Sequence, residues 1–314
     1  MNPARKFREL LNRKEPILTP AAYDALTARI IEMAGFELIG ISGFGLSAAF
    51  LGKPDVGLMT LTELAEATRH ITGAVEVPVT CDADTGFGNA INVMRTTELL
   101  IKAGVAGIHI EDQVEPKRCG HVAGKQVISM EEAVGKYRAA NRVRNELNPD
   151  LVLVARTDSR GAQDGTIEEV VRRGIAYAKA GADVVHPEGL LTLDELRQCV
   201  AEIPVPILYN MVGVSPYASL SELEEIGVAM VIDAAGPIRA TIKAVYDYLA
   251  GLATGHTEFI INFNDTLKGH PTEDIHAFVG FGEYRKLEEI FLPSEEVQRR
   301  YNQTIGYKPS KNGD

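Results

Sequence analysis

The chain has 314 residues, of which 45% are hydrophobic and 24% are charged, the composition of an ordinary globular protein. With 32 Lys and Arg against 43 Asp and Glu, its formal charge of −11 disfavours phosphate backbones and anionic lipids, so neither a nucleic acid nor a membrane is expected as a partner. No run approaches the roughly 18 apolar residues of a membrane span, the start does not read as a signal peptide, and three cysteines are too few for a disulfide framework. These features predict a soluble cytoplasmic protein.

Short apolar runs that end in polar residues alternate with stretches of helical periodicity. The predicted strands cover residues 17–24, 38–42, 77–84, 107–112, 151–158, 184–189, 206–212 and 230–234. Strands this apolar, separated by helices, are buried on both faces and indicate a parallel sheet. Eight such units favour a closed (β/α)₈ barrel over an open doubly wound sheet, and no Gly-x-Gly-x-x-Gly follows the first strand.

We expect a barrel domain over residues 1–250, a C-terminal helical extension over 251–301 and a loose polar tail over 302–314. The polar insertion at about 113–128 is too long for a simple turn between strand and helix. We interpret this insertion as a lid.

Polar residues cluster at the carboxyl ends of the predicted strands, where a barrel of this type places its active site. Asp82 and Asp84 are two residues apart, so in an extended strand both carboxylates face one side. Glu111 on the neighbouring strand adds a third carboxylate. Three anions this close require protonation or a cation among them, and hard oxygen ligands suit Mg²⁺ or Mn²⁺. For any single aspartate, the alternative is a cap on the following helix.

A second group of reactive side chains lies in the segment KRCGH, residues 117–121. Cys119 is flanked by Lys117, Arg118 and His121, a cationic setting that is expected to lower the pKa of its thiol. Such a thiol could act as a nucleophile or as a proton donor. The alternative is a surface loop in which the cysteine has no role.

Several segments together resemble the isocitrate lyase/phosphoenolpyruvate mutase superfamily. They are ISGFG (41–45), LGKPDVG (51–57), DADTGFGN (82–89), GIHIEDQ (107–113), KRCGH (117–121), ARTD (155–158) and PEG (187–189). Within the superfamily, the segment KRCGH resembles the corresponding segment of the carbon–carbon lyases. The resemblance implies a Mg²⁺-dependent lyase that cleaves a 2-hydroxy di- or tricarboxylate by retro-aldol chemistry, best matched by 2-methylisocitrate giving pyruvate and succinate. It leaves 2,3-dimethylmalate lyase and oxaloacetate hydrolase as alternatives, and a phosphonate mutase or hydrolase as a more distant one.

The resemblance also implies the roles of individual residues. Asp82 and Asp84 would hold Mg²⁺, or Mn²⁺, directly or through water, with Glu111 behind them. The implied catalytic residues are Cys119, the general acid on the lid, with Lys117, His121, Arg156 and Glu188. The implied substrate-binding residues are Ser42, Gly43, Phe44, Asp55, Gly120, His186, Asn210, Ser215 and Arg239.

Three departures from the superfamily pattern lie at the pocket end that reads the non-keto half of the substrate. The first is the segment NMVGVSP (210–216), which lacks the glutamate of the pattern. The second is His186, and the third is Val122, which follows His121. His186 either packs in the core or contacts the substrate. The superfamily fold further implies a homodimer or homotetramer in which the last helix is exchanged between subunits. A non-catalytic barrel is disfavoured because the carboxylate set and the lid are both intact.

Overall fold

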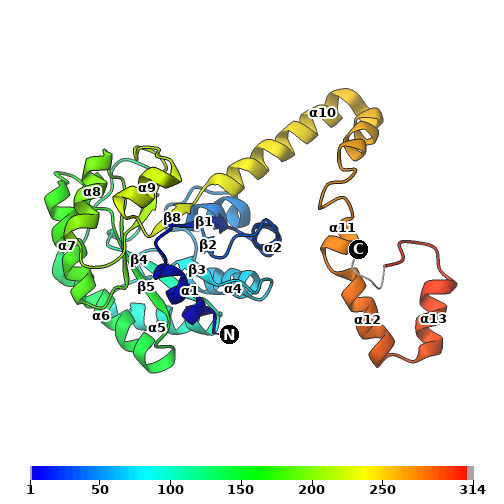
Figure 1. The fold of residues 1–314 in the computed structure, drawn as a ribbon, viewed down its shortest axis with the longest axis horizontal. Coiled ribbons are helices and arrows are strands. Elements are labelled where there is room, and N and C mark those ends of the chain that lie inside the picture. The colour runs from blue at the N-terminus through cyan, green and yellow to red at the C-terminus, as the bar shows by residue number, and fades with distance from the viewer. Residues whose placement is uncertain (1, 310–314) are drawn as a thin grey trace. The chain divides into compact units, whose positions relative to one another are not determined.

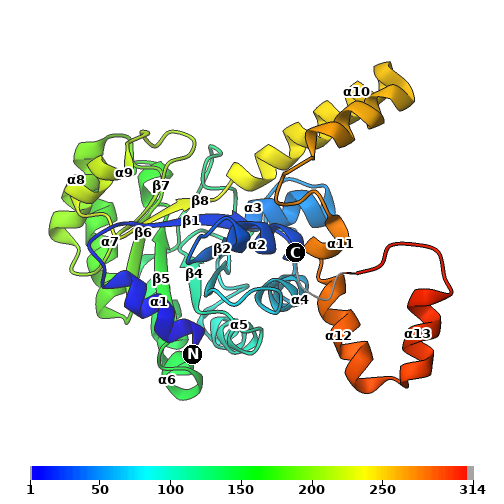
Figure 2. The same cartoon turned by 45° about the vertical axis from the view of Figure 1, so that its right-hand side comes forward.

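The computed structural model describes residues 2–309 and contains a nearly closed barrel of eight parallel strands with helices around it (Figures 1 and 2). The strands are β1 Ile17–Ala22, β2 Ile39–Ile41, β3 Val79–Asp82, β4 Gly107–Glu111, β5 Val152–Thr157, β6 Val184–Pro187, β7 Leu208–Asn210 and β8 Met230–Asp233. The helices are α1 Pro3–Leu11, α2 Ala25–Met33, α3 Gly43–Leu46, α4 Leu61–Thr72, α5 Ala90–Lys102, α6 Met130–Leu147, α7 Ile167–Lys179, α8 Leu193–Glu202, α9 Leu220–Ile226, α10 Gly236–Thr266, α11 Ile275–Phe278, α12 Phe281–Phe291 and α13 Ser294–Asn302. A π-helical turn, Ser47–Leu51, and a 3₁₀ turn, Ser159–Gly161, follow α3 and β5.

The strands are ordered β6-β5-β4-β3-β2-β1-β8-β7, and each strand ladder is parallel. One bridge between Val185 and Ile207 joins the two ends of this order, β6 and β7. The predicted (β/α)₈ barrel is confirmed. The strands are shorter than predicted at one or both ends, and at the carboxyl ends of β3 and β5 the polar residues Asp84 and Asp158 lie beyond the ladder in loops of the site.

The helices of the barrel start at side chains that satisfy the free amides of the first turn. Such caps are Asp24, Thr60, Asn89, Ser129, Thr166, Thr192 and Ser219. At Thr60, Asn89 and Ser219 the third helical residue also bonds back to the cap, so these helices begin at a defined residue.

The barrel interior contains inward-facing apolar side chains of the strands together with Phe7 of α1. Phe7 is fully buried, and a Cβ on Gly107 of β4 would lie 2.8 Å from its ring. Arg8 holds α1 against the barrel by donating to the carbonyls of Asp150 and Leu151 and to the carboxylate of Asp183. Helix α1 therefore closes the amino-terminal end of the barrel, opposite the strand ends that carry the polar residues.

The chain divides into two compact units, residues 1–242 and residues 243–314, the second described here to residue 309. The division falls inside α10, as does the expected boundary at residue 250. At His256 the backbone leaves the helical region, with φ 48° and ψ −139°, so α10 is two helices joined at a kink. Helices α11 and α12 bury none of their residues. No helix within residues 2–309 is long and apolar enough to cross a bilayer.

Phe7 tests the closure of the barrel by α1. Phe7→Ala is expected to lower the free energy of unfolding by about 3–5 kcal/mol, because it leaves a cavity among fully buried neighbours. Urea unfolding followed by circular dichroism measures this loss. Phe7→Leu, which keeps most of the volume, should cost clearly less, and a loss below about 1 kcal/mol for the alanine variant would contradict this packing role.

Candidate active site

A cavity of about 330 Å³ lies at the carboxyl ends of the strands. Its lining comes from strand ends, from the lid and from the first turn of α10. The lining residues are Ser42, Phe44, Asp55, Asp82, Cys119, Gly120, His121, Val122, Arg156, Glu188, Asn210, Val212, Ala234, Ala235 and Arg239. The cavity is where a (β/α)₈ barrel places its chemistry.

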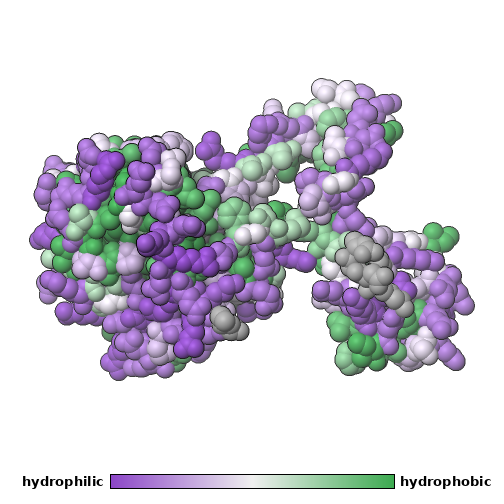
Figure 3. Space-filling view, viewed as in Figure 1, coloured by the Kyte–Doolittle hydropathy of each residue, from purple (hydrophilic) through white to green (hydrophobic). Residues whose placement is uncertain are grey.

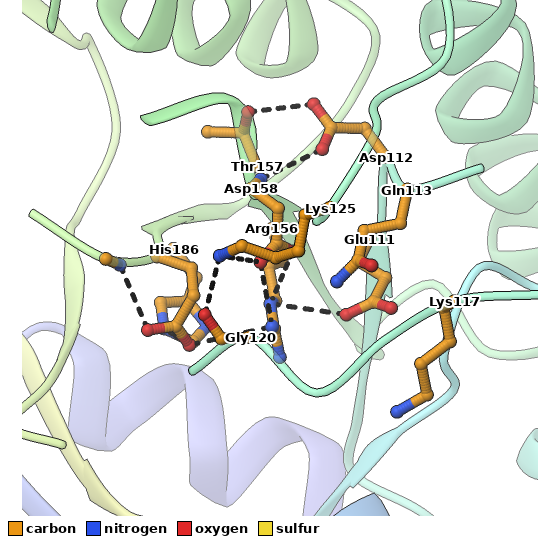
Figure 4. A network of polar contacts seen from close by, with 12 residues as sticks. Glu111, Asp112, Gln113, Lys117, Gly120, Lys125, Arg156, Thr157, Asp158 and His186 are labelled. Atoms are coloured by element: carbon orange, nitrogen blue, oxygen red, sulfur yellow. Dashed lines mark hydrogen bonds and ion pairs between the residues drawn. The ribbon is translucent and has the colours of Figure 1, made fainter. Parts of the chain in front are cut away.

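Arg156, at the end of β5, is the central cation of this cavity (Figure 4). Its guanidinium donates two hydrogen bonds to Asp158, at 2.9 and 3.1 Å. It also lies 3.3 Å from a carboxylate oxygen of Glu111 and 3.7 Å from one of Glu188. Burial by itself lowers the pKa of Arg156, but Asp158, Glu111 and Glu188 outweigh that effect and raise the pKa well above its ordinary value. Arg156 is thus a permanent charge that neutralises buried carboxylates.

Lys117 is the second buried cation and is only 2% exposed. Its ammonium lies 2.6 Å from a carboxylate oxygen of Asp55 and 2.8 Å from one of Asp84. Burial lowers the pKa of Lys117, yet Asp84 and the other nearby carboxylates raise it well above the ordinary value. Lys117 does not line the cavity; it holds together two loops beneath the cavity.

Asp82 and Asp84 meet at Gly43, but strand alternation is not the reason. Strand β3 ends at Asp82, and Asp84 lies beyond it with φ 48°, a strained conformation for a residue with a Cβ. The amide of Glu111 donates to the Asp84 carbonyl at 2.9 Å, and the Asp84 amide donates to the Asp82 carboxylate at 3.1 Å. A Cβ on Gly43 would lie 3.1 Å from Asp82 and 3.3 Å from Asp84, so any other residue would crowd both carboxylates.

The carboxylate cluster differs from the expected convergence of three anions. Within residues 2–309, no three His, Cys, Asp or Glu side chains form a group that could by itself hold a metal ion. The chain's own cations separate the acids, because Lys117 pairs with Asp84 while Arg156 lies against Glu111. Lys117 and Arg156 lower the pKa of Asp82 against the opposing effect of its burial, whereas burial raises the pKa of Asp84 to about 6.

The donor set is nevertheless suited to a hard cation. Both carboxylate oxygens of Glu111 are buried and accept no hydrogen bond, whereas Oδ1 of Asp84 lies 2.8 Å from the Lys117 ammonium. Oxygens left without a donor are costly, and a bound cation with its waters would satisfy them. Mg²⁺ is held by one or two carboxylates and keeps several waters, so it needs no three-ligand cage.

Cys119 lies in the lid and is half-buried at the cavity wall. Its amide donates to the carbonyl of Asp55 at 3.1 Å. The expected low thiol pKa is wrong: burial raises the pKa of Cys119 above its ordinary value, although the backbone bond from His121 opposes this. The ammonium of Lys117, which was expected to act on the thiol, is paired with Asp55 and Asp84. A protonated thiol suits a proton donor and does not suit a nucleophile.

Lys125 anchors the lid, and sequence reasoning missed it. It is 5% exposed, and its ammonium donates to the Gly120 carbonyl at 2.6 Å and to Asp158 at 3.1 Å (Figure 4). A Cβ on Gly120 would lie 2.2 Å from the Arg156 guanidinium, so this close approach of the lid requires glycine. In the sequence, neither the residue type nor the spacing of Lys125 distinguishes it from the other basic residues of the polar insertion.

Glu188 is 1% exposed at the end of β6, and several donors surround it. Asn210 donates to it at 3.2 Å, and Nε2 of His186 lies 3.4 Å away. Burial is the main reason why the pKa of His186 falls to about 4, so this imidazole is neutral. Neither ring nitrogen of His186 has a hydrogen-bond partner among the described residues. His186 is buried beside Glu188 and does not line the cavity.

The structure brings most of the predicted site residues together at the cavity. Predicted residues in the lining are Ser42, Phe44, Asp55, Asp82, Cys119, Gly120, His121, Arg156, Glu188, Asn210 and Arg239. Predicted residues behind the lining are Gly43, Asp84, Glu111, Lys117, His186 and Ser215. Val122 and Val212, which lie at two of the departures from the superfamily pattern, also line the cavity. Sequence reasoning did not include Ala234 and Ala235, whose position after β8 could have indicated them although their side chains carry no chemical signal.

The fold and the cavity define a barrel enzyme whose buried acids are balanced by two cations and covered by a thiol-bearing lid. The chain belongs to the family described as phosphoenolpyruvate phosphomutase, whose model matches residues 7–253. This match confirms the superfamily resemblance.

Curated relatives cover nearly the whole chain. The chain is 41% identical over 303 residues to 2,3-dimethylmalate lyase of Eubacterium barkeri, covering 96% of this chain and 99% of that protein. It is 39% identical over 304 residues to 2-methylisocitrate lyase of Aeropyrum pernix, and the match covers 96% of this chain and 95% of that protein. Both relatives are lyases.

Solved structures agree with this placement. Oxaloacetate acetylhydrolase in complex with 3,3-difluorooxalacetate matches with a TM-score of 0.83 at 32% identity, covering 92% of this chain and 96% of that one. Phosphonopyruvate hydrolase in complex with oxalate and Mg²⁺ matches with a TM-score of 0.82 at 30% identity, covering 93% and 100%.

Lys125→Met tests the anchoring of the lid. The variant keeps the length of the side chain but leaves Asp158 short of a partner, so the lid is expected to detach more often. Limited trypsin digestion should cut after the exposed Arg118 at least several-fold faster than in the parent protein. Lys102→Met, which removes a surface ion pair with Glu98, is the matched control. Equal digestion rates for the Lys125 and Lys102 variants would exclude the anchoring role.

Proposed function

We propose that the protein is a Mg²⁺-dependent carbon–carbon lyase that cleaves a 2-hydroxy di- or tricarboxylate by retro-aldol chemistry and releases a keto acid. The observation that carries the proposal is the thiol of Cys119 at the same cavity as Asp82 and Arg156, where burial raises its pKa above the ordinary value. The named candidate is 2-methylisocitrate, giving pyruvate and succinate. The names of the two curated relatives support this candidate and 2,3-dimethylmalate.

Asp82 and Asp84 would hold Mg²⁺, directly or through water, with Glu111 behind them. Mn²⁺ has the same ligand preference and could replace it. Bound metal supplies Lewis acidity that lowers the pKa of the substrate 2-hydroxyl. The Mg²⁺ named in the phosphonopyruvate hydrolase complex supports a metal at this position. The unsatisfied oxygens of Glu111 support it independently.

In the proposed reaction, Arg156, Cys119 and the lid have separate roles. Arg156 orients the carboxylate of the keto-acid half, because its guanidinium is held in one position by Asp158. Cys119 delivers a proton to the carbon that leaves as a carbanion, and its raised pKa keeps that proton on the sulfur at neutral pH. The lid, held by Lys125, keeps water away from the carbanion until this proton is transferred.

Oxaloacetate hydrolysis is a second candidate, supported by the similarity to oxaloacetate acetylhydrolase. It would use the same metal position and lid, with water attacking the keto group. A phosphonate mutase or hydrolase is less well supported, because the segment KRCGH around Cys119 resembles the carbon–carbon lyase branch.

The direct test measures pyruvate release from 2-methylisocitrate, 2,3-dimethylmalate, citramalate and isocitrate, with and without EDTA, and oxaloacetate loss alongside. Metal-dependent cleavage of at least one hydroxy acid is expected. Cys119→Ser should lower turnover about 10²–10⁴-fold, since it removes the general acid, while calorimetry shows Mg²⁺-dependent oxalate binding unchanged. Full activity of this variant would overturn the proton-donor role.

We further propose that the chain forms a homodimer or homotetramer through its second unit. Large apolar side chains are exposed on α12, where Tyr284, Leu287 and Phe291 share one face, and Figure 3 shows apolar surface there. Multi-angle light scattering is expected to give a multiple of 34.1 kDa. Tyr284→Glu combined with Leu287→Glu should reduce this mass, whereas Lys286→Glu should not. A monomeric parent protein would contradict the proposal.

We also propose a cytoplasmic location. Cys81, Cys119 and Cys199 are all free thiols, which supports a reducing compartment.

A further inference from the structure

Asp112 follows β4 directly, does not line the cavity and is 1% exposed (Figure 4). Its carboxylate accepts four hydrogen bonds. Oδ1 accepts from the amide of Asp158 at 2.9 Å. Oδ2 accepts from the hydroxyls of Thr157 and Tyr177 at 2.8 and 2.7 Å, and from the guanidinium of Arg173 at 3.0 Å. Because two of the four donors belong to consecutive residues, this carboxylate fixes the backbone where β5 ends.

The backbone that Asp112 holds carries the guanidinium of the cavity. Arg156 is the last residue but one of β5, and it donates two hydrogen bonds to the Asp158 carboxylate, at 2.9 and 3.1 Å. Glu111 and Glu188 lie farther from the guanidinium, at 3.3 and 3.7 Å. A shift of about 1 Å in a group that orients a substrate can cost about 10²-fold in rate. Asp112 therefore acts on Arg156 through Asp158, from outside the cavity.

Gln113, the next residue, holds the part of the lid that carries the thiol. Its side chain is buried and meets the backbone of Arg118 twice. Nε2 donates to the Arg118 carbonyl and Oε1 accepts from the Arg118 amide, both at 2.9 Å. Cys119 follows, and its own amide donates to the carbonyl of Asp55 at 3.1 Å. The peptide before the thiol is thus held by a side chain at the root of the lid.

The two ends of the lid are also fastened at this point. The amide of Ile128 donates to the carbonyl of Asp112 at 2.9 Å, and Gln113 forms an antiparallel bridge with Val127. Arg173 of α7, which pairs with Asp112, donates to the Ile128 carbonyl at 3.0 Å. The buried ion pair behind β5 therefore joins both roots of the lid to the strand that carries the guanidinium.

We propose that the dipeptide Asp112–Gln113 positions the two groups that face the substrate. Asp112 sets the place of the Arg156 guanidinium, and Gln113 sets the place of the Cys119 thiol. The kinetic consequence rests on the lyase function proposed above, whereas both positions can be measured without turnover. A residue that only stabilises the fold would disturb the two groups together. A positioning residue disturbs the one group that it holds.

The first experiment measures the calorimetric Kd of oxalate with Mg²⁺, since oxalate is a carboxylate probe for Arg156. Asp112→Asn offers one acceptor oxygen where the carboxylate offers two, so oxalate affinity is expected to fall at least tenfold. Thr157→Val keeps the Asp112 ion pair, removes one donor and should weaken binding about threefold. Thr97→Val, which removes an equally buried hydroxyl from α5, is the matched control and should bind oxalate like the parent protein.

The second experiment measures the rate at which iodoacetamide alkylates Cys119, because Cys81 and Cys199 are fully buried. Gln113→Met keeps the length of the side chain and removes both bonds to the lid backbone. Alkylation is expected to be at least threefold faster, and kcat for pyruvate release at least tenfold lower. Oxalate affinity should stay within twofold of the parent value. Gln198→Met, on α8 and not at the cavity, is the control.

The outcomes separate the two proposals. Unchanged oxalate affinity in Asp112→Asn, or in Thr157→Val if the first variant does not fold, would overturn the role of Asp112. Unchanged alkylation and kcat in Gln113→Met would overturn the role of Gln113. Equal disturbance of oxalate affinity and alkylation by both variants would indicate a structural effect alone and overturn the positioning.

The parent protein tests the lyase function separately. Absence of metal-dependent pyruvate release from every hydroxy acid would overturn that function, while oxalate affinity and alkylation would still decide the positioning of the two groups. Absence of oxalate binding by the parent protein would overturn Arg156 as a carboxylate site, and the role given to Asp112 with it.

Discussion

The neutralisation of buried carboxylates by Arg156 and Lys117 is the interaction on which the rest of the site depends. An isolated buried carboxylate costs more free energy than a folded domain can spare, so it must be paired or protonated. Arg156 faces Asp158, Glu111 and Glu188, while Lys117 faces Asp55 and Asp84. These two cations allow a barrel with an apolar interior to carry a strongly acidic cavity at one end.

The same charges also place the lid. Asp158 binds Arg156 and Lys125 together, and Lys125 in turn holds the carbonyl of Gly120, next to Cys119. In this arrangement the thiol faces the cavity while the lid lies against Asp158, the carboxylate that binds Arg156. This connection fixes the position of the Arg156 guanidinium and the position of the Cys119 thiol together. Such coupling is consistent with the proposed reaction, in which a carbanion would be protonated by the thiol with water excluded.

Strand order divides the chemistry of the cavity. Charged residues follow β3, β5 and β6, whereas small apolar residues follow β7 and β8. The two groups therefore lie on different arcs of the same cavity, with Arg239 of α10 beside the apolar one.

The sequence by itself determined the eight strands, the barrel and most of the cavity lining, because apolar periodicity and polar strand ends are local signals. It also indicated Cys119 and the lid. Only the tertiary structure decided that the Cys119 pKa rises, that Lys117 and Arg156 separate the acids, and that Lys125 anchors the lid. These properties arise from burial and from partners far apart in the chain, such as Lys125 and Asp158, and spacing along the sequence carries no record of either.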